Sequence, residues 1–308
     1  MSIALLFPGQ GSQAPGMLHR LPDHPAVLRT IEEMSAALGH DASTLDSPEA
    51  LRSTVSVQLA LLAAGVAAAR ALEEEGVIPE AVAGLSVGAF AAAVHARVLA
   101  FSDCVRLVKQ RAELMERNSP DGYGLMAIVG LEEEQVVTLI QEANTAEDPV
   151  YLGNVNAPEQ IVLSGSRKGL QAVARAALRA GARKAERLNV PVLSHSPLLK
   201  PIADTLTQSL HQIPLHSPRM VYLGNVNARE LRNAGEIARD LSDNIAHGVR
   251  WYEATAVLQE LGCSLFIEMP PGRVLTGLAQ DSFPEVRSIA LAESSLSYVV
   301  QQASRHPE

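Results

Sequence analysis

The segment Gly84-Leu85-Ser86-Val87-Gly88 carries the strongest chemical signal in this chain of 308 residues. A G-x-S-x-G pattern between a strand and a helix is typical of a nucleophilic serine on a sharp turn, because small neighbours let the strand and helix approach closely. The following helix directs free N–H groups and its positive dipole end at the serine oxygen, which places the N–H of Val87 to bind an oxyanion. We therefore predict Ser86 as a nucleophile, with an ordinary glycine-rich turn as the alternative.

A serine nucleophile needs a base that removes its proton. The chain contains nine histidines, and His195 stands at the end of an apolar run and before a proline-rich helix start. A strand or loop at this point is able to deliver the side chain to a site. We predict His195 as the base, and His247 is the second choice. A purely structural histidine is the alternative in both cases.

Arg111 lies on the apolar face of a predicted helix over 103–117. With 3.6 residues per turn, Cys104, Val108, Ala112 and Met115 share one face, and Arg111 falls in its middle. A charge on such a face must be paired or must extend to solvent. An internal salt bridge is one interpretation. The other is that Arg111 binds a substrate carboxylate through two parallel hydrogen bonds.

The N-terminal segment FPGQGSQA, residues 7–14, allows two interpretations. Glycines at 9 and 11 with Ala14 after a strand imitate a dinucleotide-binding fingerprint. However, Pro15-Gly16 follows at once, where that fingerprint needs a continuing helix. The alternative is a turn that presents backbone N–H groups to a reacting carbonyl. No H-E-x-x-H, C-x-x-C or Walker pattern occurs, so we expect neither a metal nor a cofactor.

Short strands that alternate with helices are expected to position these residues. The apolar run 3–7 predicts a buried strand, and 81–83 predicts a second strand directly before the serine turn. Helices are predicted over 57–75, 89–96 and 101–118, the last with Ser102 or Asp103 as its N-cap. Alternation of helix and strand returns over 191–308.

The pattern of elements changes after Pro120. Strands are predicted over 125–129, 150–154, 160–164 and 185–190, and helices over 131–143 and 166–180. The order strand-helix-strand-strand-helix-strand is that of a ferredoxin-like unit. We therefore predict a small domain over 124–190, inserted into a larger α/β domain formed by 1–123 and 191–308.

An exact repeat is also present, for which the sequence suggests no function. YLGNVNA occurs at 151–157 and again at 222–228. Each copy predicts a strand that runs into an asparagine turn.

The composition excludes several classes of protein. Hydrophobic residues make up 47% of the chain and charged residues 19%, which is enough for a large core and excludes a mainly disordered protein. A net charge of −9 and only 4% aromatic residues argue against nucleic-acid binding. The longest apolar stretch, 59–69, is too short to span a bilayer, and two cysteines form no disulfide framework. We expect a cytoplasmic protein with no membrane partner.

Taken together, these motifs resemble the malonyl-CoA:acyl carrier protein transacylases. The resemblance rests on FPGQGSQ at the start, G-x-S-x-G some eighty residues later, QRAELM with Arg111, and SHSPLLKP with His195. It continues through NAPEQIVLSG (156–165), HGVRW (247–251) and FIEMPPGRVLTGL (266–278). Nearly the whole chain is covered, and the order and spacing of the motifs are specific although each motif alone is not.

The resemblance implies an α/β-hydrolase-like large domain with an inserted ferredoxin-like small domain. It implies a Ser86–His195 pair without a catalytic carboxylate, and an oxyanion hole made by the backbone N–H groups of Gln10 and Val87. Arg111 would hold the free malonyl carboxylate. A backbone carbonyl of the HGVRW segment, foremost that of Arg250, would orient the histidine. Malonyl-CoA and an acyl carrier protein are the implied partners.

The sequence departs from the usual family pattern at the serine turn, where G-H-S-L-G-E is replaced by GLSVGAF. Leu85 and Ala89 replace a histidine and a glutamate, and Met269 stands where the family usually has glycine. GLSVGAF is similar to the epsilon subunit of bacterial malonate decarboxylase, which implies that enzyme's own carrier subunit as the acceptor. Malonyl transfer in fatty-acid or polyketide synthesis is the alternative within the family. A serine thioester hydrolase and a non-catalytic scaffold that binds carrier protein are alternatives of other classes.

Overall fold

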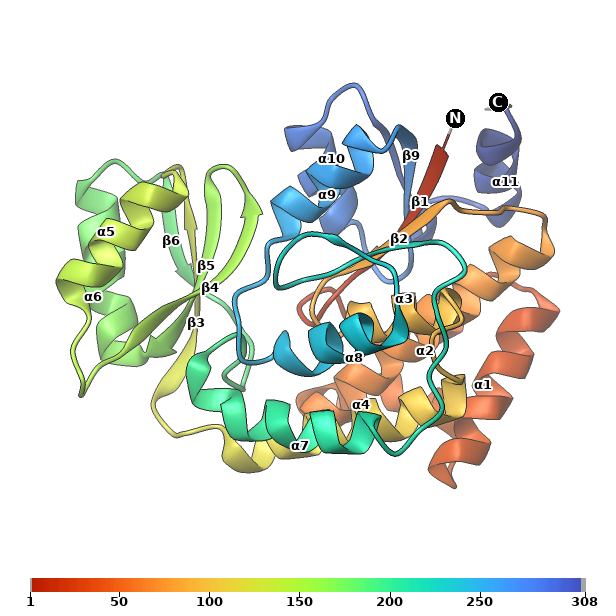
Figure 1. The fold of residues 1–308 in the computed structure, drawn as a ribbon, viewed down its shortest axis with the longest axis horizontal. Helices are drawn as coiled ribbons and strands as arrows, with labels where there is room; N and C mark the ends of the chain where they lie inside the picture. Colours follow the sequence, from red (N-terminus) through yellow and green to blue (C-terminus); the bar gives the residue numbers. More distant parts are fainter. Residues whose placement is uncertain (1, 306–308) are drawn as a thin grey trace.

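A six-stranded sheet forms the centre of the larger part of the molecule (Figure 1). The computed structural model describes residues 2–305. The strand order is β10-β9-β1-β2-β7-β8, and all neighbours are parallel except β7 and β8, which are antiparallel. The strands are β1 (Ser2–Phe7), β2 (Ala81–Gly84), β7 (Val221–Leu223), β8 (Glu230–Leu231), β9 (Cys263–Glu268) and β10 (Arg287–Ala290).

Both faces of this sheet are covered by helices, as expected for a parallel sheet. The N-terminal helices are α1 (Pro25–Leu38), α2 (Thr54–Glu74), α3 (Gly88–His95) and α4 (Phe101–Asn118). The C-terminal helices are α7 (Lys200–Leu210), α8 (Ala234–Asp243), α9 (Trp251–Glu260), α10 (Val274–Ser282) and α11 (Leu296–Ser304). The predicted helices and strands of this part lie within a few residues of the observed ones.

Helix α2 is the central core helix of this part. By length and composition it is apolar enough to cross a membrane, but 83% of its most apolar window is buried inside the protein. It contacts α1, α3 and α4. Its apolar character is therefore explained by packing on all sides.

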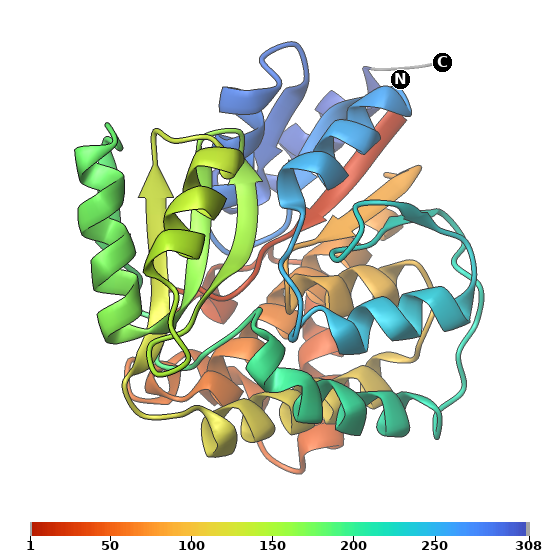
Figure 2. The same ribbon diagram turned by 60° about the vertical axis from the view of Figure 1, so that its left-hand side comes forward.

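The second sheet is formed by the middle of the chain and is entirely antiparallel, with the order β4-β5-β3-β6 (Figure 2). Its strands are β3 (Tyr123–Val129), β4 (Val150–Ala157), β5 (Gln160–Ser166) and β6 (Lys184–Arg187), and its helices are α5 (Glu133–Ala143) and α6 (Arg167–Arg179). The predicted order of elements is confirmed. The last strand is shorter than predicted, because residues 188–190 leave the sheet, and Leu188 and Val190 line a cavity instead.

Two local predictions are wrong. Helix α4 begins at Phe101 with Ala100 as its N-cap, so Ser102 and Asp103 lie inside the first turn. Residues 9–17 form turns rather than the helix that a dinucleotide fingerprint requires, and the first helical element after β1 is a short 3₁₀ turn at Leu18–Arg20. The observed turn therefore contradicts the dinucleotide-binding interpretation, and the second interpretation stays a prediction.

Candidate active site

Ser86 lies on a strained turn between β2 and α3. Its φ angle is 55°, a left-handed conformation that residues other than glycine rarely adopt. The flanking glycines are required by close backbone contact. A Cβ atom on Gly84 would lie 2.2 Å from the carbonyl carbon of Gly88, and one on Gly88 would lie 2.2 Å from the Phe7 carbonyl oxygen. The predicted serine turn is therefore present and exposes the hydroxyl at the start of a helix.

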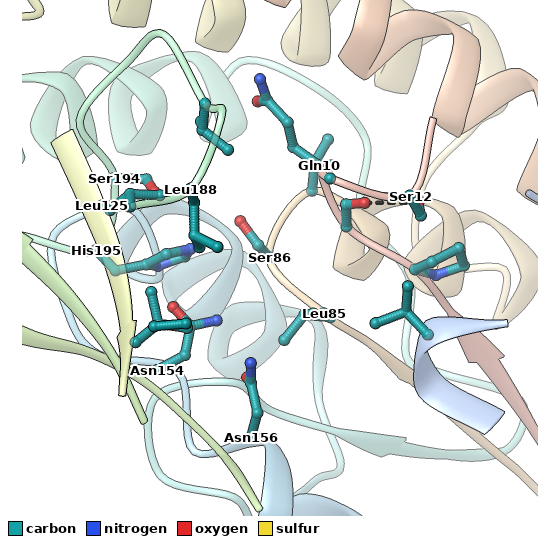
Figure 3. A pocket seen from close by; sticks show the side chains of 18 of the residues that line it. Gln10, Ser12, Leu85, Ser86, Leu125, Asn154, Asn156, Leu188, Ser194 and His195 are labelled. Carbon is teal, nitrogen blue, oxygen red and sulfur yellow. Dashed lines mark hydrogen bonds between the residues drawn. The ribbon is translucent and has the colours of Figure 1, made fainter. Parts of the chain in front are cut away.

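The side chain of Ser86 projects into a cavity of about 220 Å³ between the two sheets (Figure 3). Ser86, Gln10 and Leu85 come from the larger part of the chain, whereas Asn154 and Asn156 come from β4 (Figure 3). The backbone N–H groups of Gln10 and Val87 donate no hydrogen bond to any residue of 2–305. Both residues line the cavity, so two free donors lie near the serine.

His195 lines the same cavity (Figure 3) and is held by backbone carbonyls. Its Nδ1 atom lies 2.6 Å from the carbonyl oxygen of Asn244 and 3.3 Å from that of His247. Because carbonyl oxygens only accept hydrogen bonds, Nδ1 carries the proton and Nε2 keeps its lone pair. Nε2 is not hydrogen-bonded to the Ser86 hydroxyl in this structure; such contacts often tighten only when substrate binds.

The prediction for Arg250 is wrong, although a carbonyl of the HGVRW segment, that of His247, does lie 3.3 Å from His195 Nδ1. The carbonyl of Arg250 is not the one that binds His195, because Asn244 and His247 occupy that position. The guanidinium group of Arg250 instead makes a bidentate ion pair with Glu133 of α5 and a further contact with Glu253. Arg250 therefore links the two parts of the chain rather than orienting the histidine.

Burial in the cavity wall lowers the pKa of His195 to about 4, and the nearby Arg111 acts in the same direction. The two carbonyl acceptors oppose this shift but do not cancel it. The imidazole is therefore neutral at pH 7, which is the form that a general base requires.

We expect the rate constant for acylation of Ser86 to fall with a midpoint near pH 4, as His195 becomes protonated, rather than near the ordinary histidine value of 6.5. Rapid-quench measurements between pH 4 and pH 8 check this. Burial raises the pKa of Asp240 to about 6, so Asp240→Asn is measured in parallel to separate its titration. A midpoint near 6.5 in both proteins contradicts the prediction.

Arg111 is a buried cation without a carboxylate partner in the described part of the chain. Its side chain is 1% exposed, and no carboxylate of residues 2–305 forms an ion pair with it. It donates to Gln58 Oε1 at 2.7 Å and to Ser86 Oγ at 3.3 Å. Burial lowers its pKa only to about 10, so it remains charged at pH 7. The internal salt bridge is thus absent, and the charge faces the cavity beside the serine.

Three residues that hold this site were not predicted from the sequence. Gln58 accepts from Arg111, and its amide donates to Gln10 Oε1 at 3.3 Å. Asn225 contacts the serine turn, and Asn244 contacts His195. A glutamine within the otherwise apolar stretch 57–69 and the asparagine of the YLGNVNA repeat are signals that could have found two of them.

Comparison with known proteins identifies the family. An acyl transferase domain model matches residues 4–299. A curated malonyl CoA-acyl carrier protein transacylase of Haemophilus influenzae is 35% identical, with 97% of this chain and 98% of that protein covered. The Escherichia coli K12 protein of the same name is 37% identical, with 95% and 96% covered. The chain belongs to the malonyl-CoA:acyl carrier protein transacylase family. It is therefore an acyltransferase.

Solved structures of malonyl transacylases have the same α/β fold. The malonyl CoA-acyl carrier protein transacylase of Coxiella burnetii superimposes with a TM-score of 0.94 at 33% identity, over 99% of this chain and 98% of that chain. A malonyl-transacylase in complex with its type II PKS acyl-carrier protein superimposes with a TM-score of 0.93 at 35% identity, over 98% and 100% of the two chains.

Proposed function

We propose that this acyltransferase moves a malonyl group from malonyl-CoA to the thiol of an acyl carrier protein, with Ser86 as the covalent carrier of the acyl group. The observation that supports this most strongly is Arg111, a charged, buried guanidinium that has no carboxylate partner among residues 2–305 and donates to Ser86 Oγ at 3.3 Å. Malonyl thioesters carry a free carboxylate, which an arginine binds through two parallel hydrogen bonds.

In the first half of the reaction, Nε2 of His195 accepts the proton of the Ser86 hydroxyl as its oxygen attacks the thioester carbonyl. The N–H groups of Gln10 and Val87 donate to the oxyanion of the tetrahedral intermediate; loss of one such donor typically costs about 3 kcal/mol. The C–S bond then breaks, and the His195 proton passes to the departing CoA thiolate. The product is malonyl-Ser86.

The second half reverses these steps with a new thiol. His195 accepts the proton of the thiol on the prosthetic arm of the carrier protein, and the resulting thiolate attacks malonyl-Ser86. The Ser86 oxygen leaves and recovers the proton from His195. The carbonyl groups of Asn244 and His247 stabilise the imidazolium that forms in each half, in place of the carboxylate of a hydrolase triad. Because backbone carbonyls stand where a hydrolase triad has a carboxylate, the contacts of His195 argue against the serine thioester hydrolase alternative.

The comparisons favour a carrier protein of fatty-acid or polyketide synthesis as the acceptor. The relatives reported above are named malonyl CoA-acyl carrier protein transacylases, and one malonyl-transacylase is in complex with a type II PKS carrier. The GLSVGAF turn is the single observation that favours the malonate decarboxylase carrier. Of its two unusual residues, Leu85 lines the cavity, whereas Ala89 is fully buried in α3.

Competition between acceptors tests this choice. The enzyme is loaded with malonyl-CoA and mixed with equal amounts of a fatty-acid synthase carrier and a malonate decarboxylase carrier, each with its prosthetic thiol. Preferential malonylation of the fatty-acid carrier, measured by intact mass, is the expected result. Preferential malonylation of the decarboxylase carrier assigns the enzyme to that branch. No malonylation of either carrier contradicts the proposed acceptor class.

Replacement of Arg111 by alanine is expected to reduce malonyl transfer far more than acetyl transfer, because only malonyl makes the carboxylate contact. A charge-assisted contact of this kind is worth roughly 1.5–3 kcal/mol, so we expect the ratio of malonyl to acetyl kcat/KM to fall about 10- to 100-fold. Steady-state kinetics with malonyl-CoA and acetyl-CoA measure it. Arg111→Lys is the matched control, since it keeps the charge and loses the paired geometry. An equal loss of kcat/KM for malonyl-CoA and acetyl-CoA contradicts a role of Arg111 in selectivity.

We also propose that the chain divides into an α/β-hydrolase-like domain, 1–123 and 191–308, and a ferredoxin-like domain, 124–190. The order and pairing of the strands in each sheet support this division. The cavity lies where the two meet, so the smaller unit supplies one wall of the site.

A further inference from the structure

The strained backbone at Ser86 needs support from the surrounding structure. A left-handed conformation at a residue other than glycine costs roughly 1–3 kcal/mol and persists only where neighbouring groups hold it. The close contacts of Gly84 and Gly88 permit the turn but do not by themselves fix the position of the serine. Hydrogen bonds to the turn supply such support.

The side-chain amide of Asn225 spans the turn on both sides of Ser86. Its Oδ1 atom accepts from the backbone N–H of Ser86 at 2.8 Å, and its Nδ2 atom donates to the carbonyl oxygen of Gly84 at 2.8 Å. Asn225 is only 3% exposed. One planar group thus satisfies a donor and an acceptor of the turn on either side of Ser86.

Asp240 of α8 holds Asn225 in turn. Its carboxylate accepts the backbone N–H of Asn225 at 2.9 and 3.0 Å and that of Val226 at 3.0 Å. Asp240 is itself buried. A Cβ atom on Gly224 would lie 3.0 Å from Asp240 Oδ1, so the loop after β7 packs directly against the carboxylate.

The same end of α8 also holds the base. Asn244 follows Asp240 by one helical turn. Its backbone carbonyl accepts from His195 Nδ1, and its side-chain Nδ2 donates to the carbonyl oxygen of Ser86 at 3.5 Å. The backbone of Ser86 is therefore bound from both its N–H and its C=O side by groups that α8 supports. This places the nucleophile and the base on one common support.

We propose that Asn225, fixed by Asp240, is a positioning residue that holds Ser86 in the orientation required for attack. The inference rests on the proposed function only in taking Ser86 as the nucleophile. It also gives the second YLGNVNA copy a role, since Asn225 is the asparagine of its YLGN segment. The equivalent asparagine of the first copy, Asn154, lines the cavity instead.

Loss of the Asn225 amide leaves the N–H of Ser86 and the carbonyl of Gly84 without this partner, and the serine is then free to shift. A displacement of about 1 Å at a reacting group can cost about 100-fold in rate. Asn225→Asp keeps the volume and the acceptor but removes the donor to Gly84. Asp240→Asn is expected to have a smaller effect, about tenfold, because an amide oxygen in the place of Oδ1 still accepts the N–H groups of Asn225 and Val226.

The test measures how fast Ser86 reacts with a fluorophosphonate, which phosphonylates active-site serines with loss of fluoride and does not need a malonyl group. The rate constant and the fraction labelled are determined for the wild type, Asn225→Ala, Asn225→Asp and Asp240→Asn. Malonylation by malonyl-CoA is measured in parallel by rapid quench. Asn227→Ala is the matched control, because Asn227 belongs to the same repeat and is exposed.

We expect Asn225→Ala to label completely but about 100-fold more slowly, with Asn227→Ala within about twofold of the wild type. A rate constant for Asn225→Ala within threefold of the wild type overturns the proposal. An unchanged rate constant with a reduced labelled fraction also overturns it, because that result indicates a structural role only. If Asn225→Ala does not fold, Asn225→Asp decides by the same criteria. A wild type that labels with the probe but takes no malonyl group refutes the proposed function, while the labelling rates still decide this inference.

Discussion

The Ser86→Ala enzyme is expected to form no malonyl adduct and to lose at least about 10³-fold in transfer activity, because the covalent step has no nucleophile. Intact mass spectrometry after brief mixing with malonyl-CoA measures the adduct directly. The wild type should gain one malonyl group. Acetyl-CoA, tested in parallel, should leave far less adduct, since an acetyl group offers Arg111 no carboxylate.

Ser194→Ala is the matched control for this experiment. Ser194 is another serine that lines the cavity, but it does not lie on the strained turn. A malonyl adduct that persists in Ser86→Ala would falsify the assignment of the nucleophile. A wild type with no adduct and an intact thioester supports the non-catalytic scaffold, whereas free CoA that accumulates without an adduct supports a thioester hydrolase.

The His195→Ala enzyme is expected to acylate at least about 10³-fold more slowly, because the Ser86 hydroxyl then has no neutral base to accept its proton. Binding of malonyl-CoA should change little, since Arg111 and the cavity walls remain. The rate constant for acylation comes from rapid-quench kinetics, and the affinity comes from its dependence on malonyl-CoA concentration. A loss in the rate constant with an unchanged affinity identifies a role in the chemical step.

His247→Ala distinguishes the two histidines that the sequence suggested. The structure assigns only the backbone carbonyl of His247 to the site, and its side chain is exposed. This variant should therefore retain acylation within about threefold, since the carbonyl remains. Comparable losses in His195→Ala and His247→Ala contradict the assignment of His195 as the single base.

Much of the fold followed from local patterns. The buried strand before Pro8, the core helix α2 and the order of elements in the second sheet are confirmed, because apolar periodicity and turn residues act over short stretches of chain. The ends of the helices were predicted less accurately than their presence. The N-cap of α4 was placed two or three residues too late, because Ser102 and Asp103 are good cap residues while Ala100 is not.

Some residues of the site could likewise be predicted from local patterns, and others could not. Ser86, with its flanking glycines, has a local signature because the turn itself requires those residue types. Arg111 was found because a charge interrupts an apolar helix face. Asn225 and Asn244 carry no local signature of comparable strength. They act across 139 and 158 residues of chain, respectively, on Ser86, and only the folded structure shows those contacts.

The group that orients His195 shows most clearly what tertiary structure decided. Resemblance suggested the carbonyl of Arg250, but every residue has a backbone carbonyl, so residue type cannot indicate which one is used. The end of α8 brings the carbonyl of Asn244 to 2.6 Å from Nδ1. The sequence by itself therefore predicted the nucleophile, the base and the buried cation, because these roles depend on side-chain chemistry. The tertiary structure decided which backbone groups and amides align them, because those roles depend on position alone.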